Sequence, residues 1–154
     1  MRIVLQRVLR AKCTVDEKIT GEIGKGYLLF MGVEESDTSY IADQMIEKII
    51  NLRIFEDENG KINKNIDYVD GGILFIPQFT LYADCRKGNR PNFIAAASPQ
   101  MAEAMYNYML EHLRGKAKKV EAGIFGADMK IELINDGPFT LNLDSNVLNF
   151  KKEI

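Results

Sequence analysis

Two stretches of period-2 alternation near the C-terminus constrain the fold more than any other feature of this sequence. Apolar residues alternate with polar ones over 129–133 and again over 139–143, which is typical of half-buried β-strands. Between them lies Asn135-Asp136-Gly137-Pro138, a favourable turn because Asn, Asp and Gly tolerate positive φ angles. The sequence therefore predicts a β-hairpin with strands at 127–134 and 139–144.

The rest of the chain supplies further strands and two helices. Serine and threonine over 36–39 offer helix N-caps, and Ser98-Pro99 places a second N-cap before a proline at the first helical position. Further strands are expected at 1–9, 12–20, 26–33, 53–55, 72–76 and 119–125. We expect one α+β domain over residues 1–154, with a compact, largely antiparallel, curved or barrel-like sheet and two main helices.

Composition limits the functional classes. The 154 residues are 46% hydrophobic and 27% charged, with a formal net charge of −2, so no global basic field indicates nucleic-acid binding. The first residues resemble neither a signal nor a transit peptide, and the apolar runs are too short to span a bilayer. We expect a cytoplasmic protein with no membrane partner.

Cysteine and histidine are too few for common catalytic devices. Cys13 and Cys85 are the only cysteines, and His112 is the only histidine. This pattern predicts free thiols and neither a metal site nor a cofactor. His112 comes late in a predicted helix, where a surface or capping role is favoured over catalysis.

The segment 75–82 begins as a buried strand and then carries polar residues. Pro77 interrupts it, which places this point at a sheet edge or bulge, where backbone N–H groups are free to meet a ligand. Gln78 and Thr80 follow. The alternative is an ordinary edge strand whose polar side chains face water.

A basic loop follows this segment. It holds Arg86, Lys87 and Arg90 within five positions and ends at Phe93. Cations beside an aromatic ring suit phosphate and a stacked base. Three charges in a loop are also common on any solvated surface, so the loop alone does not decide the function.

Several motifs become specific when they are taken together. QRV, GEIGKGYLLFMGV, PQFTLYAD with KGNRPNF, GIFGADMKIELINDGPFT and LDS occur in this order. From residue 1 to about 145, the sequence resembles the D-aminoacyl-tRNA deacylases, or D-tyrosyl-tRNA deacylases. The family signature Asn-x-Gly-Pro-x-Thr is intact over 135–140. The signature Ser-Gln-x-Thr departs at its first position, where Pro77 replaces serine before Gln78, Phe79 and Thr80.

The resemblance implies homodimers that hydrolyse the ester between a D-amino acid, or glycine mischarged on tRNA-Ala, and the tRNA 3′ end. It also implies a cis peptide between Gly137 and Pro138 that enters the active site of the other subunit. There the dipeptide would form a wall that an L side chain strikes. A D side chain points elsewhere and glycine has none, so both would pass.

Further residues are expected at the site. By the resemblance, Arg7 would hold the Gly-Pro loop, which includes Phe139; the alternative is a solvated surface arginine. Phe79 would bound the adenine pocket or belong to the core. Met129 would line the same pocket or only pack in the core.

Two mechanisms fit these residues, and neither needs a metal or cofactor. Thr80 could be a nucleophile or orient water, although the sequence offers it no obvious base. Alternatively, the substrate 2′-OH assists water while backbone N–H groups around Gln78 to Thr80 stabilise the oxyanion, which we favour. Rival hypotheses are a hydrolase of small D-amino-acid esters and a non-enzymatic dimer that binds RNA ends or protein.

Overall fold

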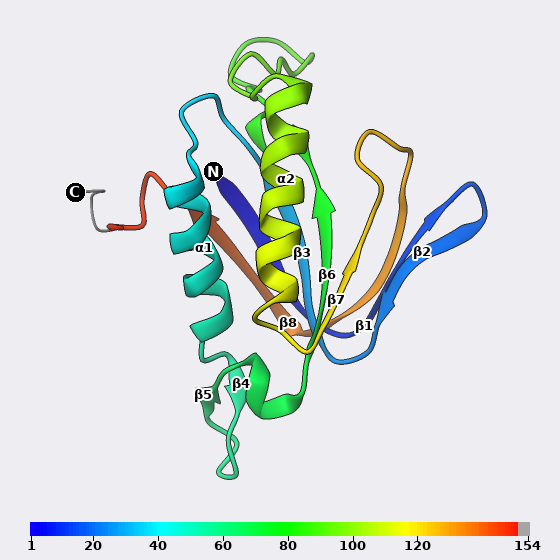
Figure 1. The fold of residues 1–154 in the computed structure, drawn as a ribbon, viewed down its shortest axis with the longest axis vertical. Helices are drawn as coiled ribbons and strands as arrows, with labels where there is room; N and C mark the ends of the chain where they lie inside the picture. Colours follow the sequence, from blue (N-terminus) through cyan, green and yellow to red (C-terminus); the bar gives the residue numbers. More distant parts are fainter. Residues whose placement is uncertain (151–154) are drawn as a thin grey trace.

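A computed structural model describes residues 1–150, which form a curved mixed sheet covered by helices (Figure 1). The elements in chain order are β1 (Arg2–Val15), β2 (Lys18–Ile23), β3 (Gly26–Gly32), α1 (Ser39–Asn51), β4 (Phe55–Glu56), β5 (Ile62–Lys64), the 3₁₀ helix η1 (Ile66–Val69), β6 (Gly72–Pro77), the 3₁₀ helix η2 (Phe79–Tyr82), α2 (Pro99–Arg114), β7 (Lys119–Ala122) and β8 (Lys130–Asp144).

The sheet is built around the long strand β1. One edge of β1 pairs with β8, and the other pairs first with β3 and then with β2, all antiparallel. β3 pairs in parallel with β6, and β6 in parallel with β7. Parallel neighbours need crossover connections, and α1 and α2 lie in these two crossovers. The predicted α+β class, with a curved sheet and two main helices, is confirmed, but the sheet is mixed because β3, β6 and β7 are parallel.

The two ends of the sheet approach each other, which gives it a barrel-like shape. Gly21 on β2 lies so close to β7 that an added Cβ atom would be 2.9 Å from Glu121 Cβ and 3.0 Å from the carbonyl oxygen of Ala122. A smaller core cluster, which includes Val8, Cys13 and Leu28, fills the curve of the sheet.

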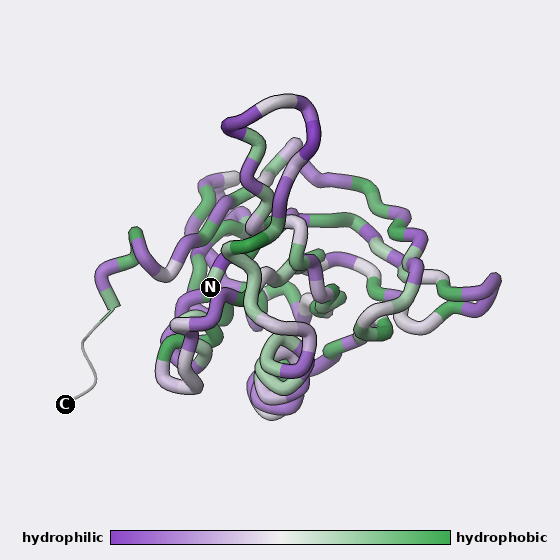
Figure 2. Tube along the Cα trace, turned by 90° about the horizontal axis from the view of Figure 1, so that it is seen from above, coloured by the Kyte–Doolittle hydropathy of each residue, from purple (hydrophilic) through white to green (hydrophobic). Residues whose placement is uncertain are grey.

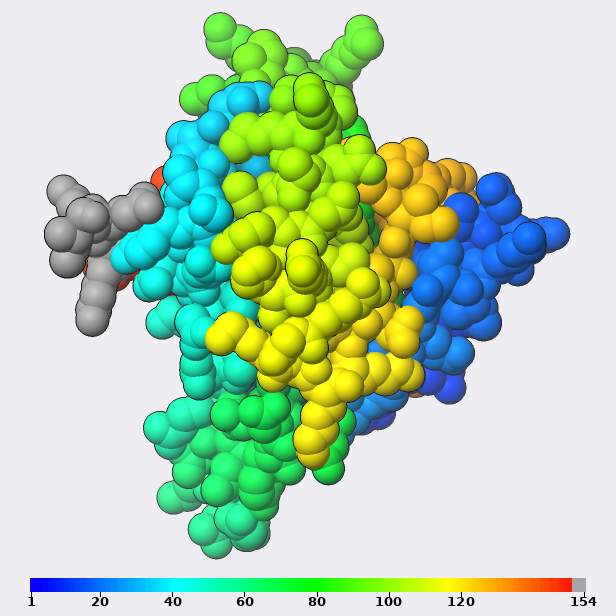
Figure 3. All heavy atoms as spheres, viewed as in Figure 1, coloured from blue at the N-terminus to red at the C-terminus, as the bar shows by residue number. Residues whose placement is uncertain are grey.

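The two helices lie side by side on one face of the sheet (Figures 1 and 2) and cover much of it in the space-filling view (Figure 3). The predicted N-caps are confirmed: the Thr38 hydroxyl accepts from Ile41 N at 3.3 Å, and the Ser98 hydroxyl accepts from Met101 N at 3.4 Å. The larger core cluster lies between these helices and the sheet. Within residues 1–150, no helix is long and apolar enough to cross a membrane.

The predicted hairpin over 127–144 is wrong. Both halves belong to the single strand β8, and both pair with β1: Asn135 lies opposite Val8, and Thr140 lies opposite Gln6. Between these two pairs, the chain advances by five residues on β8 but by only two on β1. The extra residues of β8 form a bulged loop. A bulge and a hairpin both interrupt a strand with Asn, Asp and Gly, so local sequence does not separate them.

The boundary between the first two strands was also predicted wrongly. β1 continues through to Val15, and the chain reverses at Asp16 and Glu17, whose φ angles are 48° and 64°. This two-residue turn with positive φ at both positions joins β1 to β2 as an antiparallel hairpin.

Candidate functional site

A cavity of about 560 Å³ opens where β3 and β6 end and α2 begins. Its size falls within the range of sites for small molecules and cofactors. Most of its lining is apolar, and it includes Pro77, Gln78, Phe79, Phe93, Tyr106 and Met129. The structure thus brings Met129 to the same cavity as the Gln78–Phe79 segment.

Pro77 ends β6 at a point where the strand has lost one neighbour. It still pairs with Met31 on β3, but the pairing with β7 stops at Phe75. The predicted sheet-edge position is therefore confirmed, and the chain then turns into η2. Phe79 is 56% exposed, so the alternative that it belongs to the core is wrong.

Two backbone donors are open at the start of η2. The Gln78 N–H donates to the Met31 carbonyl at 2.7 Å. The prediction that this N–H is open to a ligand is therefore wrong. The N–H groups of Phe79 and Thr80 have no hydrogen-bond partner among the described residues, as expected for the first residues of a helix. The Gln78 amide donates to the Thr80 hydroxyl at 2.5 Å, which fixes that side chain beside the two donors.

Two polar side chains that line the cavity, Tyr106 and Asp128, already have partners within the chain. Tyr106 donates to the Phe75 carbonyl at 2.8 Å, and burial raises its pKa to about 12. The Asp128 carboxylate is paired with Lys130 at 2.9 Å. His112 does not line the cavity, and its Nδ1 lies 2.7 Å from the Tyr108 carbonyl oxygen. Within residues 1–150, no cluster of His, Cys, Asp or Glu could hold a metal ion.

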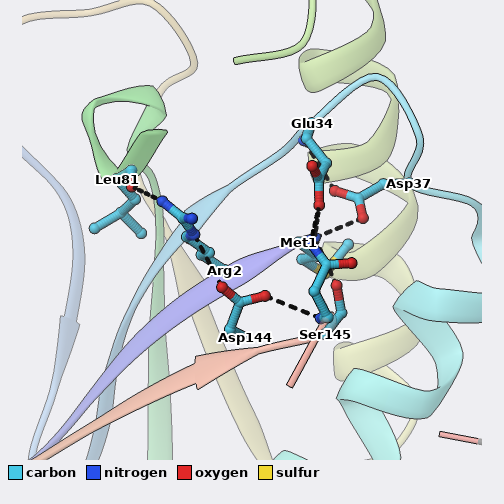
Figure 4. A network of polar contacts seen from close by, with 8 residues as sticks. Met1, Arg2, Glu34, Asp37, Leu81, Asp144 and Ser145 are labelled. Atoms are coloured by element: carbon cyan, nitrogen blue, oxygen red, sulfur yellow. Dashed lines mark hydrogen bonds and ion pairs between the residues drawn. The ribbon is translucent and has the colours of Figure 1, made fainter. Parts of the chain in front are cut away.

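Arg2, at the start of β1, ties η2 to the last residue of β8 (Figure 4). Its Nη1 donates to the Leu81 carbonyl at 3.0 Å, and its Nε donates to the Asp144 carboxylate at 3.1 Å. The guanidinium also lies over the Tyr82 ring, 4.5 Å from the centroid. The neighbouring Met1 amino group is buried and bonds Asp37 at 2.6 Å.

The Gly-Pro loop is held by its own first residue. The Asn135 side-chain oxygen accepts from Phe139 N at 2.6 Å, and its NH₂ group donates to the Phe139 carbonyl and the Thr140 hydroxyl at 3.2 and 3.3 Å. Asn135 and Thr140 are the first and last residues of Asn-x-Gly-Pro-x-Thr, and the hydrogen bonds from Asn135 close the bulged loop at these two ends. The Gly137–Pro138 peptide is cis, and Gly137 has a φ angle of 142°.

Arg7, on the neighbouring strand β1, supports the same loop. Its side chain donates to the carbonyls of Asp136 at 3.1 Å and Ile54 at 2.6 Å, and it lies over the Phe139 ring at 4.7 Å. Arg7 is only 8% exposed, so the alternative of a solvated surface arginine is wrong. The contact with Ile54 also joins the loop to the chain that enters β4.

The two candidate regions do not meet within one chain. The loop lies beside Arg7, which pairs with Tyr27, whereas Pro77 pairs with Met31 at the other end of β3. Four residues along a strand span about 13 Å, and β1 and β3 also lie between β8 and β6. Neither Gly137 nor Pro138 is among the residues lining the cavity, and both are exposed.

Comparison with known proteins agrees with these motifs. Residues 4–144 match the family described as D-Tyr-tRNA(Tyr) deacylase. The chain belongs to this deacylase family. A D-aminoacyl-tRNA deacylase of Caldicellulosiruptor saccharolyticus is 52% identical over 145 residues, covering 94% of this chain and 97% of the relative. One of Deinococcus deserti is 51% identical over 144 residues, covering 94% and 99%.

Two solved structures share the fold of this chain. The c-Myc DNA Unwinding Element Binding Protein is 40% identical, with a TM-score of 0.88 over 94% of this chain and 98% of its own. A probable eukaryotic D-amino acid tRNA deacylase has a TM-score of 0.78 at 18% identity, over 92% and 97%. At that identity the second likeness shows the fold alone.

The sequence does not predict two contributors to the site. Asn135 is predicted only as a turn former, although its four-residue distance from Phe139 is a signal for a side-chain clamp. Tyr106 reaches the cavity from α2, and no local pattern predicts this. Phe93, which the sequence marks as the aromatic end of the basic loop, lines the cavity and packs edge-on against Phe79, with ring centroids 4.9 Å apart.

Proposed function

We propose that this protein hydrolyses the ester bond of D-aminoacyl-tRNA and of glycyl-tRNA mischarged on tRNA-Ala, releasing the amino acid and free tRNA. Family membership and the cavity beside the Gln78–Thr80 segment support this function. The observation that carries it is the pair of open N–H donors on Phe79 and Thr80 beside an apolar cavity. Such donors suit the oxyanion of an ester under attack.

The chiral filter comes from a second copy of the chain. Gly137 and Pro138 are exposed on a loop that Asn135 and Arg7 hold, yet they lie away from the cavity of their own chain. In a homodimer, this loop enters the partner's site and presents backbone beside the substrate Cα. An L side chain strikes that wall, whereas D-amino acids and glycine fit.

The substrate supplies the group that assists water. At the cavity, burial raises the pKa of Tyr106 to about 12, and the Asp128 carboxylate is paired with Lys130. The ribose 2′-OH therefore orients the attacking water and relays its proton. The C–O bond to the 3′ oxygen then breaks, and that oxygen takes the proton. Thr80, whose hydroxyl oxygen accepts from Gln78, directs its own proton toward water or substrate and forms no covalent intermediate.

The direct test compares D-Tyr-, L-Tyr- and Gly-tRNA with free D-tyrosine methyl ester. We expect release from D-Tyr- and Gly-tRNA, with little release from L-Tyr-tRNA. Equal cleavage of D- and L-Tyr-tRNA would show that the protein does not select between the two enantiomers. Turnover of the methyl ester as fast as the tRNA would favour a small-ester hydrolase, and no release at high enzyme concentration would favour a binding protein.

A further inference from the structure

The loop between η2 and α2 has a fixed base. Asp84 and Asn92 form an antiparallel bridge, with N to O distances of 2.8 and 3.1 Å in the two directions. Figure 1 shows this segment in green beyond the N-terminal end of α2. Gly88, with a φ angle of 65°, lets the chain reverse at the tip. The residues between the bridge partners therefore project as a defined arm.

The three cations of this arm are not equivalent. Arg86 is bound to the Asp84 carboxylate in two places, from Nε at 2.9 Å and from Nη2 at 2.7 Å. Lys87 and Arg90 are exposed and have no ion-pair or hydrogen-bond partner in the described part of the chain. The arm thus presents two free positive charges beside one internally neutralised pair.

The arm begins and ends at the mouth of the cavity. Phe93 follows the bridge directly, lines the cavity and packs on Phe79. Three extended residues span about 10 Å, so Arg90 lies within that reach of Phe93. Asp128, which also lines the cavity, forms an ion pair with Lys130.

We propose that Lys87 and Arg90 bind backbone phosphates of the tRNA 3′ arm, just upstream of the terminal adenosine. This inference rests on the proposed function, because it places the terminal ester at Phe79 and Thr80. An ammonium and a guanidinium are the usual ligands of phosphate oxygens. A contact limited to this arm also agrees with a chain whose net charge is −2, because the tRNA body then meets no broad basic surface.

The test compares Lys87→Gln/Arg90→Gln with a control that changes the net charge equally, Lys18→Gln/Lys48→Gln, whose lysines are exposed on other elements. The first readout is the affinity for an uncharged acceptor-stem RNA hairpin as a function of salt. Because the slope of log K against log[salt] is negative, losing two phosphate contacts makes it shallower by about 1.4–1.8. The second readout is the ratio of kcat/KM for D-Tyr-tRNA to that for 3′-D-tyrosyl adenosine, which has no phosphate. We expect this ratio to fall about tenfold.

The outcomes separate the arm from the proposed function. An unchanged salt slope in the double variant, a loss equal to that of the control, or an equal loss on both substrates would overturn the phosphate contact while leaving the deacylase function in place. If the unmodified protein cleaves neither substrate, the proposed function fails. The RNA-hairpin titration still decides the role of the arm in that case.

Discussion

The Gln78–Thr80 segment and the Asn135–Thr140 loop carry the two family signatures, yet they are stabilised in opposite ways. In the first, the N–H groups of Phe79 and Thr80 are left open beside a cavity. In the second, a side chain binds both polar groups of the Phe139 backbone, and Arg7 binds the Asp136 carbonyl. One region offers hydrogen bonds to a ligand, whereas the other uses its hydrogen bonds to fix a shape.

Under the proposed function, this difference separates the rate of hydrolysis from the choice between D and L substrates. Open donors stabilise charge that develops in the transition state, whichever enantiomer is bound. In our proposal, the fixed backbone shape of the loop does no chemistry but decides which enantiomer fits. Changes in the first region should therefore lower the rate for every substrate, and changes in the second should alter the ratio between D and L substrates.

The largest effect is expected at Phe79. Phe79→Pro removes one open N–H, and proline is tolerated at the first position of a helix. Loss of one oxyanion donor should lower kcat by roughly 10²–10³. Phe79→Ala removes the same ring but keeps the N–H, so single-turnover rates on D-Tyr-tRNA separate the two contributions. Equal rates for the two variants would show that this N–H does not serve the reaction.

The next effect is expected at Gly137. An alanine Cβ there would lie 3.0 Å from Phe139 N and 3.2 Å from Phe139 Cβ, on a backbone with a φ angle of 142°. Strain of about 1–3 kcal/mol should displace the loop, and the ratio of D- to L-Tyr-tRNA cleavage should fall about 10- to 100-fold. Gly60→Ala is the control, since Gly60 also has positive φ but lies in open space. A ratio unchanged in Gly137→Ala would contradict the role of the loop.

Arg7→Ala should have an intermediate effect on stability and selectivity. It leaves the carbonyls of Ile54 and Asp136 without their donor, which should cost about 2–4 kcal/mol of unfolding free energy in urea titrations. The D-to-L ratio should also fall, because the loop loses its support. Arg10→Ala, on an exposed position of the same strand, should change stability by less than about 0.5 kcal/mol. Similar stabilities for both variants would argue against Arg7 as the support.

The smallest effect is expected at Arg2. Arg2→Gln removes the bonds to Leu81 and Asp144, which loosens η2 without touching either donor. A hydrogen bond of about 1 kcal/mol corresponds to about fivefold in rate. Pre-steady-state kinetics should show this loss equally for D-Tyr- and Gly-tRNA. A change in the D-to-L ratio instead would show that η2 also affects selectivity. It would contradict the assignment of rate to one region and selectivity to the other.

The sequence predicts best where a feature depends on neighbouring residues. The caps Thr38 and Ser98 were predictable because a capping side chain bonds an N–H three residues away. The end of β6 was predictable from Pro77, because proline has no backbone N–H to donate to a neighbouring strand. The parallel pairing of β3, β6 and β7 was missed because it depends on crossovers through α1 and α2, which no local pattern reports.

The candidate site was predicted less completely for the same reason. Gln78, Phe79 and Met129 line one cavity, and Thr80, which is not among the lining residues, bonds Gln78 beside it. The Gln78 N–H, however, donates to the Met31 carbonyl, and this contact depends on the parallel pairing of β3 and β6. The hairpin over 127–144 failed because β1 runs past the whole of β8 and pairs with both halves. The clamp by Asn135 becomes visible only once the loop is known to be a bulge.

The most direct test of a filter that acts between subunits is to mix two variants. Phe79→Pro chains supply an intact loop but little catalysis, and Gly137→Ala chains supply catalysis without selection. When Gly137→Ala is refolded with a large excess of Phe79→Pro, nearly every active chain pairs with an intact loop. We predict that L-Tyr-tRNA cleavage per Gly137→Ala chain falls and that the D-to-L ratio returns to that of the unmodified protein. Cleavage of L-Tyr-tRNA that stays constant per Gly137→Ala chain would contradict the account.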